Sequence, residues 1–516
     1  MGCPECDVAP PPAPPPPPSL PDCSIRYVGL DGTDDENYGC DPAAPLQSVE
    51  RCVELAGDGG TCYLFPGVYA FMNSTVQNVG MHIRGVTNLT IAVAPSEVWP
   101  AGSDATEVTF DGTIAITGGW EERSDAHGVY YRSVQPYNDT VWQLFADGEA
   151  LTSARWPNAL AWSDTWWSRE QGWAQTAEGS SCGVLVDGGT ADPAAGSEGH
   201  QALADAGVSY DGCNLILNNE HWKIKRYTVA NHTAGTSTLS YDRHPNNTLC
   251  EKYAVDVDLT AYFVDGCEAA FDVAGEWVVD GQGHLRVRLP SALAAAGTPI
   301  DDVAFAGKVQ TYAAAFTECD GLTVRGVRFF ATALLVYNSA NATLEENTFV
   351  YQSASRRALG GWATEFDAIE AYGISAAANA GSLVADPEEF EIVVPTTWVG
   401  RASCEDIVTG LTYRNNFVYR TEGAGVACAF CSHDVFDNNR VEEAGYPFAR
   451  ALQFTGTMTH YVTLSRNTMR RDGSVRPPET GLPAFAHAHS TPPPQTIQIA
   501  HSLQAGWLCP IQPPGI

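Results

Sequence analysis

The sequence is short of basic residues, with 28 Lys and Arg against 61 Asp and Glu, so its formal net charge is −33. This excess of negative charge repels phosphate at long range, and nonspecific binding to nucleic acid or to anionic membranes is not expected. The chain also lacks any apolar run approaching the roughly 20 residues of a membrane-spanning helix. We therefore expect a soluble protein that neither inserts into membranes nor binds nucleic acid.

Several signatures of enzyme chemistry are missing as well. The sequence contains no glycine-rich loop of the phosphate-binding type and no convincing motif for a serine nucleophile. The acidic loop DGTDDENYGCD at 31–41 would allow Ca2+, but it lacks the glycine and terminal glutamate spacing of a helix-loop-helix calcium site. A capping loop is the better interpretation, and no metal site or firm cofactor is predicted.

The residues that are present suffice for a large fold. With 516 residues, of which 44% are hydrophobic, the chain can bury one large or two ordinary cores. Its 15 cysteines, together with Asn-x-Ser/Thr acceptor sites such as Asn73 and Asn341, suit an oxidising secretory compartment. Because the first residues lack the apolar core of a signal peptide, we expect an extracellular or cell-surface glycoprotein, a monomer, whose export signal is not visible in this chain.

One phrase recurs along the later part of the sequence, as GLTVRGVRFF, NATLEENTFV, GLTYRNNFV, HDVFDNNRV and YVTLSRNTM. The shared columns are apolar at Val324, Leu344, Tyr413, Phe436 and Leu464, apolar again at Phe329, Phe349, Val418, Val441 and Met469, and asparagine at Asn347, Asn416, Asn439 and Asn467. Spacings of 20, 23 and 28 residues fit one turn of a β-solenoid. The remaining interval, of 69 residues, would hide extra turns or a long loop.

Each repeated segment is a short strand that cannot bury its apolar residues alone. Stacking of successive turns about 4.8 Å apart would join these residues into a continuous interior column. Asparagines at the same place in each turn could then hydrogen-bond to one another as a ladder. The competing interpretation is an ordinary β-sandwich whose asparagine-containing turns coincide by chance.

The N-terminal part is consistent with a stacked solenoid. Between 31 and 69, an acidic loop is followed by an amphipathic helix, a Gly-Gly turn and the strand TCYLFPGVY. The helix places its apolar residues on one face: Leu46, Val49, Cys52, Val53 and Ala56. Cys40, Cys52 and Cys62 could cross-link this cap, although the sequence does not say which pair forms.

With its repeats, this opening resembles the pectin-lyase-like superfamily. The resemblance implies an all-β fold, a right-handed parallel β-helix with an N-terminal capping helix. The hairpin-rich, Trp-rich middle resembles the β-sandwich-like domain inserted in several carbohydrate-active β-helix proteins. Known enzymes of this fold mostly act on polysaccharides, and this class of function is inferred from the fold alone.

Composition and pattern divide the chain into five parts. Residues 1–22 form a proline-rich spacer, and 23–117 contain the cap and the first turns of the β-helix. The inserted β-rich domain occupies 118–304, and the main β-helix turns occupy 305–472. In 473–516 the alternating pattern is lost and Pro, His and Ala accumulate, which predicts a disordered or aberrant tail.

A first group of candidate catalytic residues, Glu422, His433 and Asp434, lies where the turns of a solenoid form the walls of a groove. Histidine and carboxylates could serve there as acid and base near neutral pH. Cys428 and Cys431 form a CxxC motif nearby, for which a disulfide or buried thiols are preferred over a metal, because only His433 is close as a further ligand. Structural roles for the whole group are the competing interpretation.

A second group follows the segment that ends at 350. Arg356 and Arg357 could bind a sugar carboxylate or sulfate through their guanidinium groups. On a strand, Glu365 and Asp367 would face the same side about 7 Å apart, which overlaps the separation in inverting glycosidases. The alternative is a solvated loop whose basic and acidic side chains pair with each other.

Two further patterns are open to a functional or a structural interpretation. Arg155 and Trp156, with other tryptophans of the inserted domain, could form a sugar-stacking platform, or they could pack at the seam with the β-helix. The outward column Arg325, Glu345, Arg414 and Asp437 alternates in charge, which predicts a weak ladder of surface ion pairs.

The leading functional interpretation is a secreted enzyme that cleaves or modifies a polysaccharide, as a lyase, a glycosidase or an epimerase. Arg356, Arg357 and His433 favour a lyase or an epimerase, whereas the net charge of −33 opposes a polyanionic substrate. The alternative is a noncatalytic carbohydrate-binding or cell-surface protein, or a truncated and inactive homologue.

Overall fold

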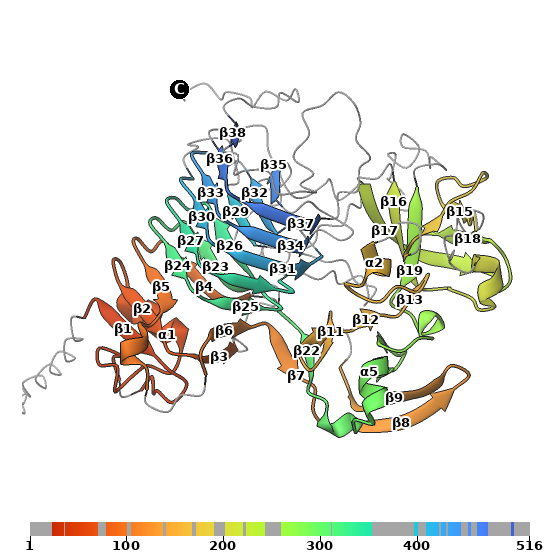
Figure 1. The fold of residues 1–516 in the computed structure, drawn as a ribbon, viewed down its shortest axis with the longest axis horizontal. Helices are drawn as coiled ribbons and strands as arrows, with labels where there is room; N and C mark the ends of the chain where they lie inside the picture. The colour runs from red at the N-terminus through yellow and green to blue at the C-terminus, as the bar shows by residue number, and fades with distance from the viewer. Residues whose placement is uncertain are drawn as a thin grey trace, which may run out of the picture.

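The computed structural model consists mainly of β-strands, with parallel sheets in one half and mostly antiparallel sheets in the other (Figure 1). It describes residues 23–35, 37–70, 79–100, 105–137, 141–167, 172–189, 202–219, 223–242, 260–310, 312–352, 397–400, 409–422, 425–429, 432–444, 452–455, 462–472 and 497–499.

Three sheets, here called A, B and C, are built from parallel strands. Sheet A contains β1 (Ile25–Val28), β2 (Thr61–Leu64), β5 (Thr90–Val93), β24 (Thr323–Arg325), β27 (Thr343–Glu345), β30 (Thr412–Arg414), β33 (Val435–Asp437) and β36 (Val462–Ser465), with β38 (Ile497–Ile499) antiparallel at its edge. Sheet B contains β3 (Gly67–Ala70), β6 (Val108–Asp111), β25 (Arg328–Phe330), β28 (Thr348–Val350), β31 (Phe417–Thr421), β34 (Arg440–Ala444) and β37 (Thr468–Asp472). Sheet C contains β4 (Val79–Arg84), β23 (Tyr312–Thr317), β26 (Ala333–Tyr337), β29 (Trp398–Gly400), β32 (Val426–Ala429) and β35 (Leu452–Thr455).

The chain visits these sheets in a fixed order. From β24 to β28 the strands alternate A, B, C, A, B, and from β29 to β37 the order C, A, B repeats three times. Each strand pairs in parallel with the preceding strand of its own sheet. Because β27 pairs directly with β30, the 69-residue interval between the repeats is an excursion and adds no strand to sheet A.

The register confirms the apolar columns predicted from the repeats. In sheet A, Leu344 is the direct partner of Val324 and of Tyr413, and the column continues to Phe436 and Leu464. The second column runs through sheet B in the same manner. Equivalent side chains therefore lie directly over one another.

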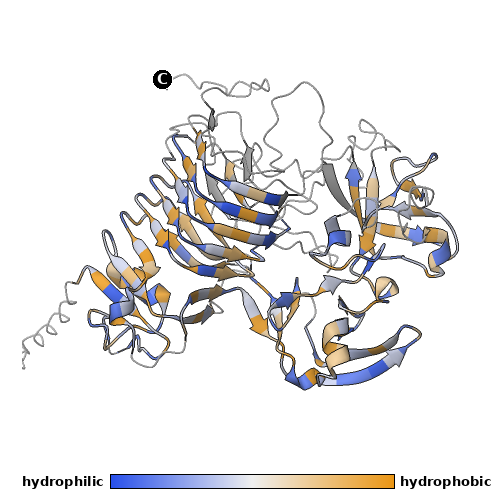
Figure 2. Cartoon of the chain, in the orientation of Figure 1, coloured by the Kyte–Doolittle hydropathy of each residue, from blue (hydrophilic) through white to orange (hydrophobic). Residues whose placement is uncertain are grey.

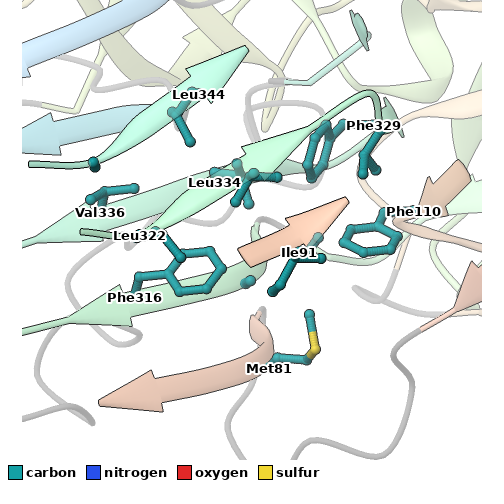
Figure 3. Packing of buried hydrophobic residues seen from close by; sticks show 14 of the residues in the cluster. Met81, Ile91, Phe110, Phe316, Leu322, Phe329, Leu334, Val336 and Leu344 are labelled. Carbon is teal, nitrogen blue, oxygen red and sulfur yellow. The ribbon is translucent and has the colours of Figure 1, made fainter. Parts of the chain in front are cut away.

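All three sheets contribute to one apolar core. Met81 from sheet C, Ile91 from sheet A and Phe110 from sheet B gather in the same interior (Figure 3). Phe329 lies edge-on to Phe110, with ring centroids 5.4 Å apart, and stacks on Phe349 at 4.7 Å. Apolar and polar stretches alternate across the parallel strands (Figure 2), as expected when one face of each sheet is buried.

The predicted asparagine ladder is confirmed at the bend between sheets A and B. The backbone N–H of Asn347 donates to Oδ1 of Asn416 at 3.0 Å, that of Asn416 to Asn439 at 2.9 Å, and that of Asn439 to Asn467 at 3.0 Å. Nδ2 of Asn416 also donates to the carbonyl of Leu344 at 2.8 Å. Each asparagine thus satisfies backbone groups that would otherwise be buried without a partner.

The outward ion-pair ladder is present as well. Glu345 accepts from Nη2 of Arg414 at 2.5 Å and lies 3.8 Å from Nε of Arg325. Asp437, in the next strand, pairs with Arg466. The arginines are about half exposed while Glu345 is mostly buried, so these ion pairs lie at the rim of the sheet.

The predicted N-terminal helix forms as α1 (Val49–Ala56), although it begins about one turn later than expected. A disulfide between Cys52 and Cys62 ties it to β2, and a second disulfide joins Cys23 to Cys40. The other helices are short: α2 spans Asp164–Trp167 and α5 spans Ser291–Ala296. Within the described ranges, no helix has the length and apolarity needed to cross a lipid bilayer.

Three mainly antiparallel sheets, here called the module, are formed by residues 113–308. The first contains β11 (Glu149–Ala150), β10 (Leu144–Ala146), β22 (Phe305–Lys308) and β7 (Thr113–Ala115). The second contains β12 (Thr152–Ser153), β20 (Glu276–Val279), β21 (His284–Val287), β9 (Gly128–Pro136) and β8 (Trp120–Asp125). The third contains β13 (Arg155–Trp156), β19 (Ala261–Asp265), β16 (Asn214–Asn219), β17 (Lys223–His232), β18 (Thr238–Tyr241) and β15 (Val184–Val186), with β14 (Ala174–Gln175) also paired to β19.

The module begins and ends at one place. Its first strand, β7, pairs antiparallel with its last strand, β22, so the chain leaves the parallel sheets and returns to them side by side. The module therefore lies between strand β6 of sheet B and strand β23 of sheet C, and its first sheet lies next to the parallel strands (Figure 1).

Candidate functional site

Four of the residues proposed from the sequence, Arg356, Arg357, Glu365 and Asp367, lie outside the described residues. Their roles stay predictions.

Asp434 and His433 are neighbours in sequence but not in environment. The side chain of Asp434 is fully buried; it accepts hydrogen bonds from the Thr409 hydroxyl at 2.7 Å and from the backbone N–H of Leu411 at 2.6 Å. Burial raises the pKa of Asp434 to about 7. His433 is exposed, has a left-handed φ of +63° and lies 2.8 Å from the Ser432 hydroxyl. The two side chains do not converge on one site, and the contacts of Asp434 are those of a structural residue.

Cys428, from the CxxC motif beside them, is disulfide-bonded, whereas Cys431 lies outside the described residues. Within the part of the chain that the structure describes, no group of three or more His, Cys, Asp or Glu is arranged to hold a metal ion.

Arg155 and Trp156 are buried inside the module, at 1% and 4% exposure. The Arg155 guanidinium lies 3.9 Å from the centre of the Phe263 ring, and its Nε donates to the carbonyl of Pro157 at 3.0 Å. Trp156 packs against Tyr262, among other rings of the third module sheet. Both residues thus pack within the module itself, rather than at its seam with the parallel sheets or on a sugar-stacking platform.

A cluster of polar side chains lies where the module meets sheet B. Arg420, in β31, donates from Nη1 to Glu149 at 2.5 Å and to the Tyr351 hydroxyl at 2.9 Å, and from Nε to Glu443 at 3.0 Å. The Tyr351 hydroxyl donates to the same oxygen of Glu149 at 3.1 Å. We call these four residues the Arg420 cluster. It joins β11 of the module, which carries Glu149, to three successive strands of sheet B, because Tyr351 follows β28, Arg420 lies in β31 and Glu443 lies in β34.

The Arg420 cluster has an apolar floor. The Tyr351 ring packs against Phe145 of the module and Phe330 of sheet B, with centroids 5.1 and 6.0 Å away, and against Trp162 at 6.0 Å. Burial raises the pKa of Tyr351 to about 12, so its hydroxyl keeps its proton at neutral pH and remains a donor. In contrast, the Glu149 side chain is 74% exposed and is open to a ligand from solvent.

Backbone geometry sets the spacing of this cluster. Ala331, Tyr351, Arg420 and Glu443 all have φ between +52° and +53°, and each stands at the end of its sheet B strand, where the chain bends away. Such left-handed residues interrupt the strict alternation of a strand. Side chains in this column are therefore placed at the edge of the sheet, where the module can reach them.

Next to the cluster, the outward face of sheet B carries aromatic and charged side chains. The rings of Phe417 and Tyr419 stack at 5.8 Å, with an interplanar angle of 18°. The Arg440 guanidinium lies over Phe417 at 4.9 Å and pairs with Glu442 at 2.8 Å, and Arg470 pairs with the same glutamate at 3.3 Å. This face combines flat apolar surface with hydrogen-bonding groups.

Of the residues at this junction, sequence reasoning selected Trp162, as one of the tryptophans of the inserted domain, and Glu422, which lies two residues after Arg420 and is 7% exposed. One signal for the others was available, because Arg420 and Glu443 are 23 residues apart, as are Asn416 and Asn439 of the asparagine ladder. Extending the repeat alignment by a few positions would have paired them. No sequence signal links either one to Glu149, which lies 271 residues before Arg420.

No protein-family model and no curated protein matches the chain. Among solved structures, one described as a "Glycoside hydrolase" is similar, with a TM-score of 0.45 and 13% identity, over 82% of this chain and 74% of that one. A second, described as "The complex structure of XylC with xylose", has a TM-score of 0.37 and 11% identity, over 82% of this chain and 54% of that one. At this level of similarity, neither neighbour assigns an activity to the chain.

Proposed function

We propose that the protein is an extracellular, carbohydrate-active β-helix protein that hydrolyses a polysaccharide at the Arg420 cluster. In this proposal sheets A, B and C are the three faces of a right-handed parallel β-helix of the pectin-lyase-like type, capped by α1. The repeated order of the strands, their parallel register and the asparagine ladder support it. The disulfides support an oxidising compartment.

The observation that carries the proposal is that one guanidinium holds two glutamates from different parts of the chain. Because Glu149 and Glu443 both bind Arg420, their carboxylates lie close enough to reach a single sugar ring. Glycosidases act with two carboxylates placed roughly 5 to 9.5 Å apart. We assign Glu443, which is mostly buried beside the guanidinium, as the nucleophile or base, and Glu149, whose side chain is open to solvent, as the acid.

The substrate would lie along the outward face of sheet B. Phe417 and Tyr419, each with a guanidinium over one side of its ring, offer their remaining apolar surface to sugar rings, and Arg440 and Glu442 offer hydrogen bonds to hydroxyl groups. A parallel stack repeats such positions at about 4.8 Å along its length. This geometry fits an extended polymer better than a small ligand.

Hydrolysis is favoured over elimination or epimerisation by the pairing of the arginines. A lyase needs a cation that neutralises the uronate carboxylate of its substrate. Arg420, Arg440 and Arg470 are each bound to a glutamate of the protein already. Together with the net charge of −33, this pairing favours a neutral polysaccharide over a polyanionic one.

The test is a screen of the purified protein against plant, algal and animal polysaccharides, which measures new reducing ends and the ultraviolet absorbance of unsaturated uronates. Reducing ends without absorbance are the expected result, and absorbance would select a lyase instead. Replacing Glu443 or Glu149 by Gln should lower kcat by about 100-fold or more. Glu122→Gln, at an exposed position of β8, is the matched control and should leave activity unchanged.

The second candidate is a noncatalytic carbohydrate-binding protein, which the half-buried aromatic pair on sheet B favours. It predicts retained binding of a glycan with no product in either assay. In that case, replacing Phe417 by Ala should weaken binding, whereas Glu443→Gln should not. Such a pair of results would overturn the enzymatic proposal.

A further inference from the structure

A buried lysine connects the module to the parallel sheets. Lys308, the last residue of β22, is 1% exposed, and its Nζ donates to the carbonyls of Ala331 at 2.5 Å, Gln352 at 3.0 Å and Tyr351 at 3.4 Å. These acceptors belong to two successive turns, which follow β25 and β28. An ammonium group is rarely buried unless its hydrogen bonds are satisfied, and here three carbonyls satisfy them.

Charged groups around Lys308 also favour its charged form. Burial lowers the pKa of Lys308 to about 7, while the negative charges of Glu422 and Asp111 act in the opposite direction. Asp111 in turn faces Arg328. The lysine thus lies among carbonyls and carboxylates at the inner end of the same junction that carries the Arg420 cluster at its surface.

A closed chain of contacts runs from Lys308 to Glu149. Strand β22 pairs with β10, where Phe305 is the partner of Ala146, and β10 pairs with β11, where Ala146 is the partner of Glu149. Glu149 then binds the Tyr351 hydroxyl, and the carbonyl of Tyr351 accepts from Lys308. Tyr351 is therefore held at its backbone by Lys308 and at its hydroxyl by Glu149 and Arg420.

We propose that Lys308 is a positioning residue, whose buried ammonium group clamps the first module sheet onto the turns of sheet B and thereby holds Glu149 against Arg420. The proposal deepens the function proposed above and rests on it for its catalytic consequence. Its structural part, the docking of β10 and β11, does not depend on any activity. The two parts can be measured separately.

Hydrogen exchange tests the structural part. Lys308→Met keeps the length and apolar stem of the side chain but removes the three hydrogen bonds, so amides in 144–150 and 328–337 should exchange about tenfold faster or more. The capping helix at 49–56 should be unchanged. Arg123→Met, which removes an exposed basic residue of β8, is the control and should leave all three segments as they are. Unchanged exchange at 144–150 in Lys308→Met would overturn the proposal.

Kinetics test the catalytic part. Lys308→Met should lower kcat by about 100-fold while KM stays within about twofold, because a displaced acid slows the reaction more than it weakens binding. Combined with Glu149→Gln, it should reduce kcat by less than about twofold further, because both changes disable the same group. Multiplicative losses in the double variant would show that Lys308 does not act through Glu149.

Failure of this inference differs from failure of the proposed function. If Glu149→Gln and Glu443→Gln reduce activity and Lys308→Met does not, only the positioning role of Lys308 is refuted. If no glycan is hydrolysed at all, the proposed function falls and hydrogen exchange alone decides whether Lys308 docks the module. If Lys308→Met does not fold, Lys308→Gln replaces it as the test, because its amide can still donate to the carbonyls. It should show the same faster exchange and lower kcat, but to a smaller extent.

Discussion

Asp434 is a carboxylic acid inside the core of the parallel sheets, and its replacement by asparagine should change how stability depends on pH. One of its oxygens accepts from the Thr409 hydroxyl and from the backbone N–H of Leu411. An asparagine oxygen can accept the same two bonds, so Asp434→Asn preserves shape and hydrogen bonding. The substitution removes only the ability of the side chain to lose a proton.

The sign follows from the direction of the pKa shift. Burial raises the pKa of Asp434 from 3.8 to about 7, so between these values the folded protein holds a proton that the unfolded chain has lost. The contribution of this group to stability is therefore complete below about pH 4 and is lost as pH rises towards 7. A shift of about three pKa units corresponds to about 4 kcal/mol at most.

The assay is urea unfolding of both proteins at several pH values between 4.5 and 8.5. The free energies of unfolding should be similar at the acidic end, and Asp434→Asn should be the more stable protein above pH 7 by up to about 4 kcal/mol. Asp301→Asn, at an exposed aspartate, controls for a general effect of removing negative charge. A difference between wild type and Asp434→Asn that stays constant across the pH range would refute the reasoning.

Three other substitutions test the packing of the parallel sheets. Asn416→Ala removes a side chain that bonds Asn439 and the buried backbone of its neighbours, and should cost about 3 kcal/mol of unfolding free energy in urea. Asn467→Ala, on the more exposed last rung, should cost less, so equal losses would contradict the ladder. The Tyr413 hydroxyl is buried and has no hydrogen-bond partner among the described residues. Tyr413→Phe should therefore increase the free energy of unfolding by about 1 kcal/mol, which a slightly higher melting temperature would show. A lower melting temperature would show that the hydroxyl is satisfied.

The parallel sheets could be predicted from sequence because their contacts repeat along it. Residues such as Leu344 and Phe436 occupy equivalent positions in short segments, and any regular stack must place them in one column. The asparagine ladder follows from the same argument, since Asn416 and Asn439 share a spacing with the apolar columns. Periodicity thus carries information about contacts that are distant in the chain.

The candidate site was not predicted because one of its two carboxylates, that of Glu149, is not part of the repeat. Glu149 reaches Arg420 through the docking of the module, which depends on the burial of rings such as Phe145 and Trp162 rather than on any repeated spacing. Asp434 was assigned to a site because acidic and histidine residues adjoin in sequence. The two residues, however, lie at the bend before β33, where the left-handed φ of His433 leaves its side chain exposed while that of Asp434 lies in the core.

The column of left-handed residues explains why the reactive groups gather at this edge. A left-handed φ at a residue other than glycine costs roughly 1 to 3 kcal/mol, yet Tyr351, Arg420 and Glu443 all adopt it. The backbone hydrogen bonds between the parallel strands offset this strain, because each strand is paired with a neighbour on both sides. The side chains at these positions leave the sheet at its edge, where those of Arg420 and Glu443 are partly exposed and that of Tyr351 is covered by the module. The side chain at this position can therefore differ from one strand of sheet B to the next while the backbone stays the same. The module then adds Glu149, a carboxylate that the repeat does not supply.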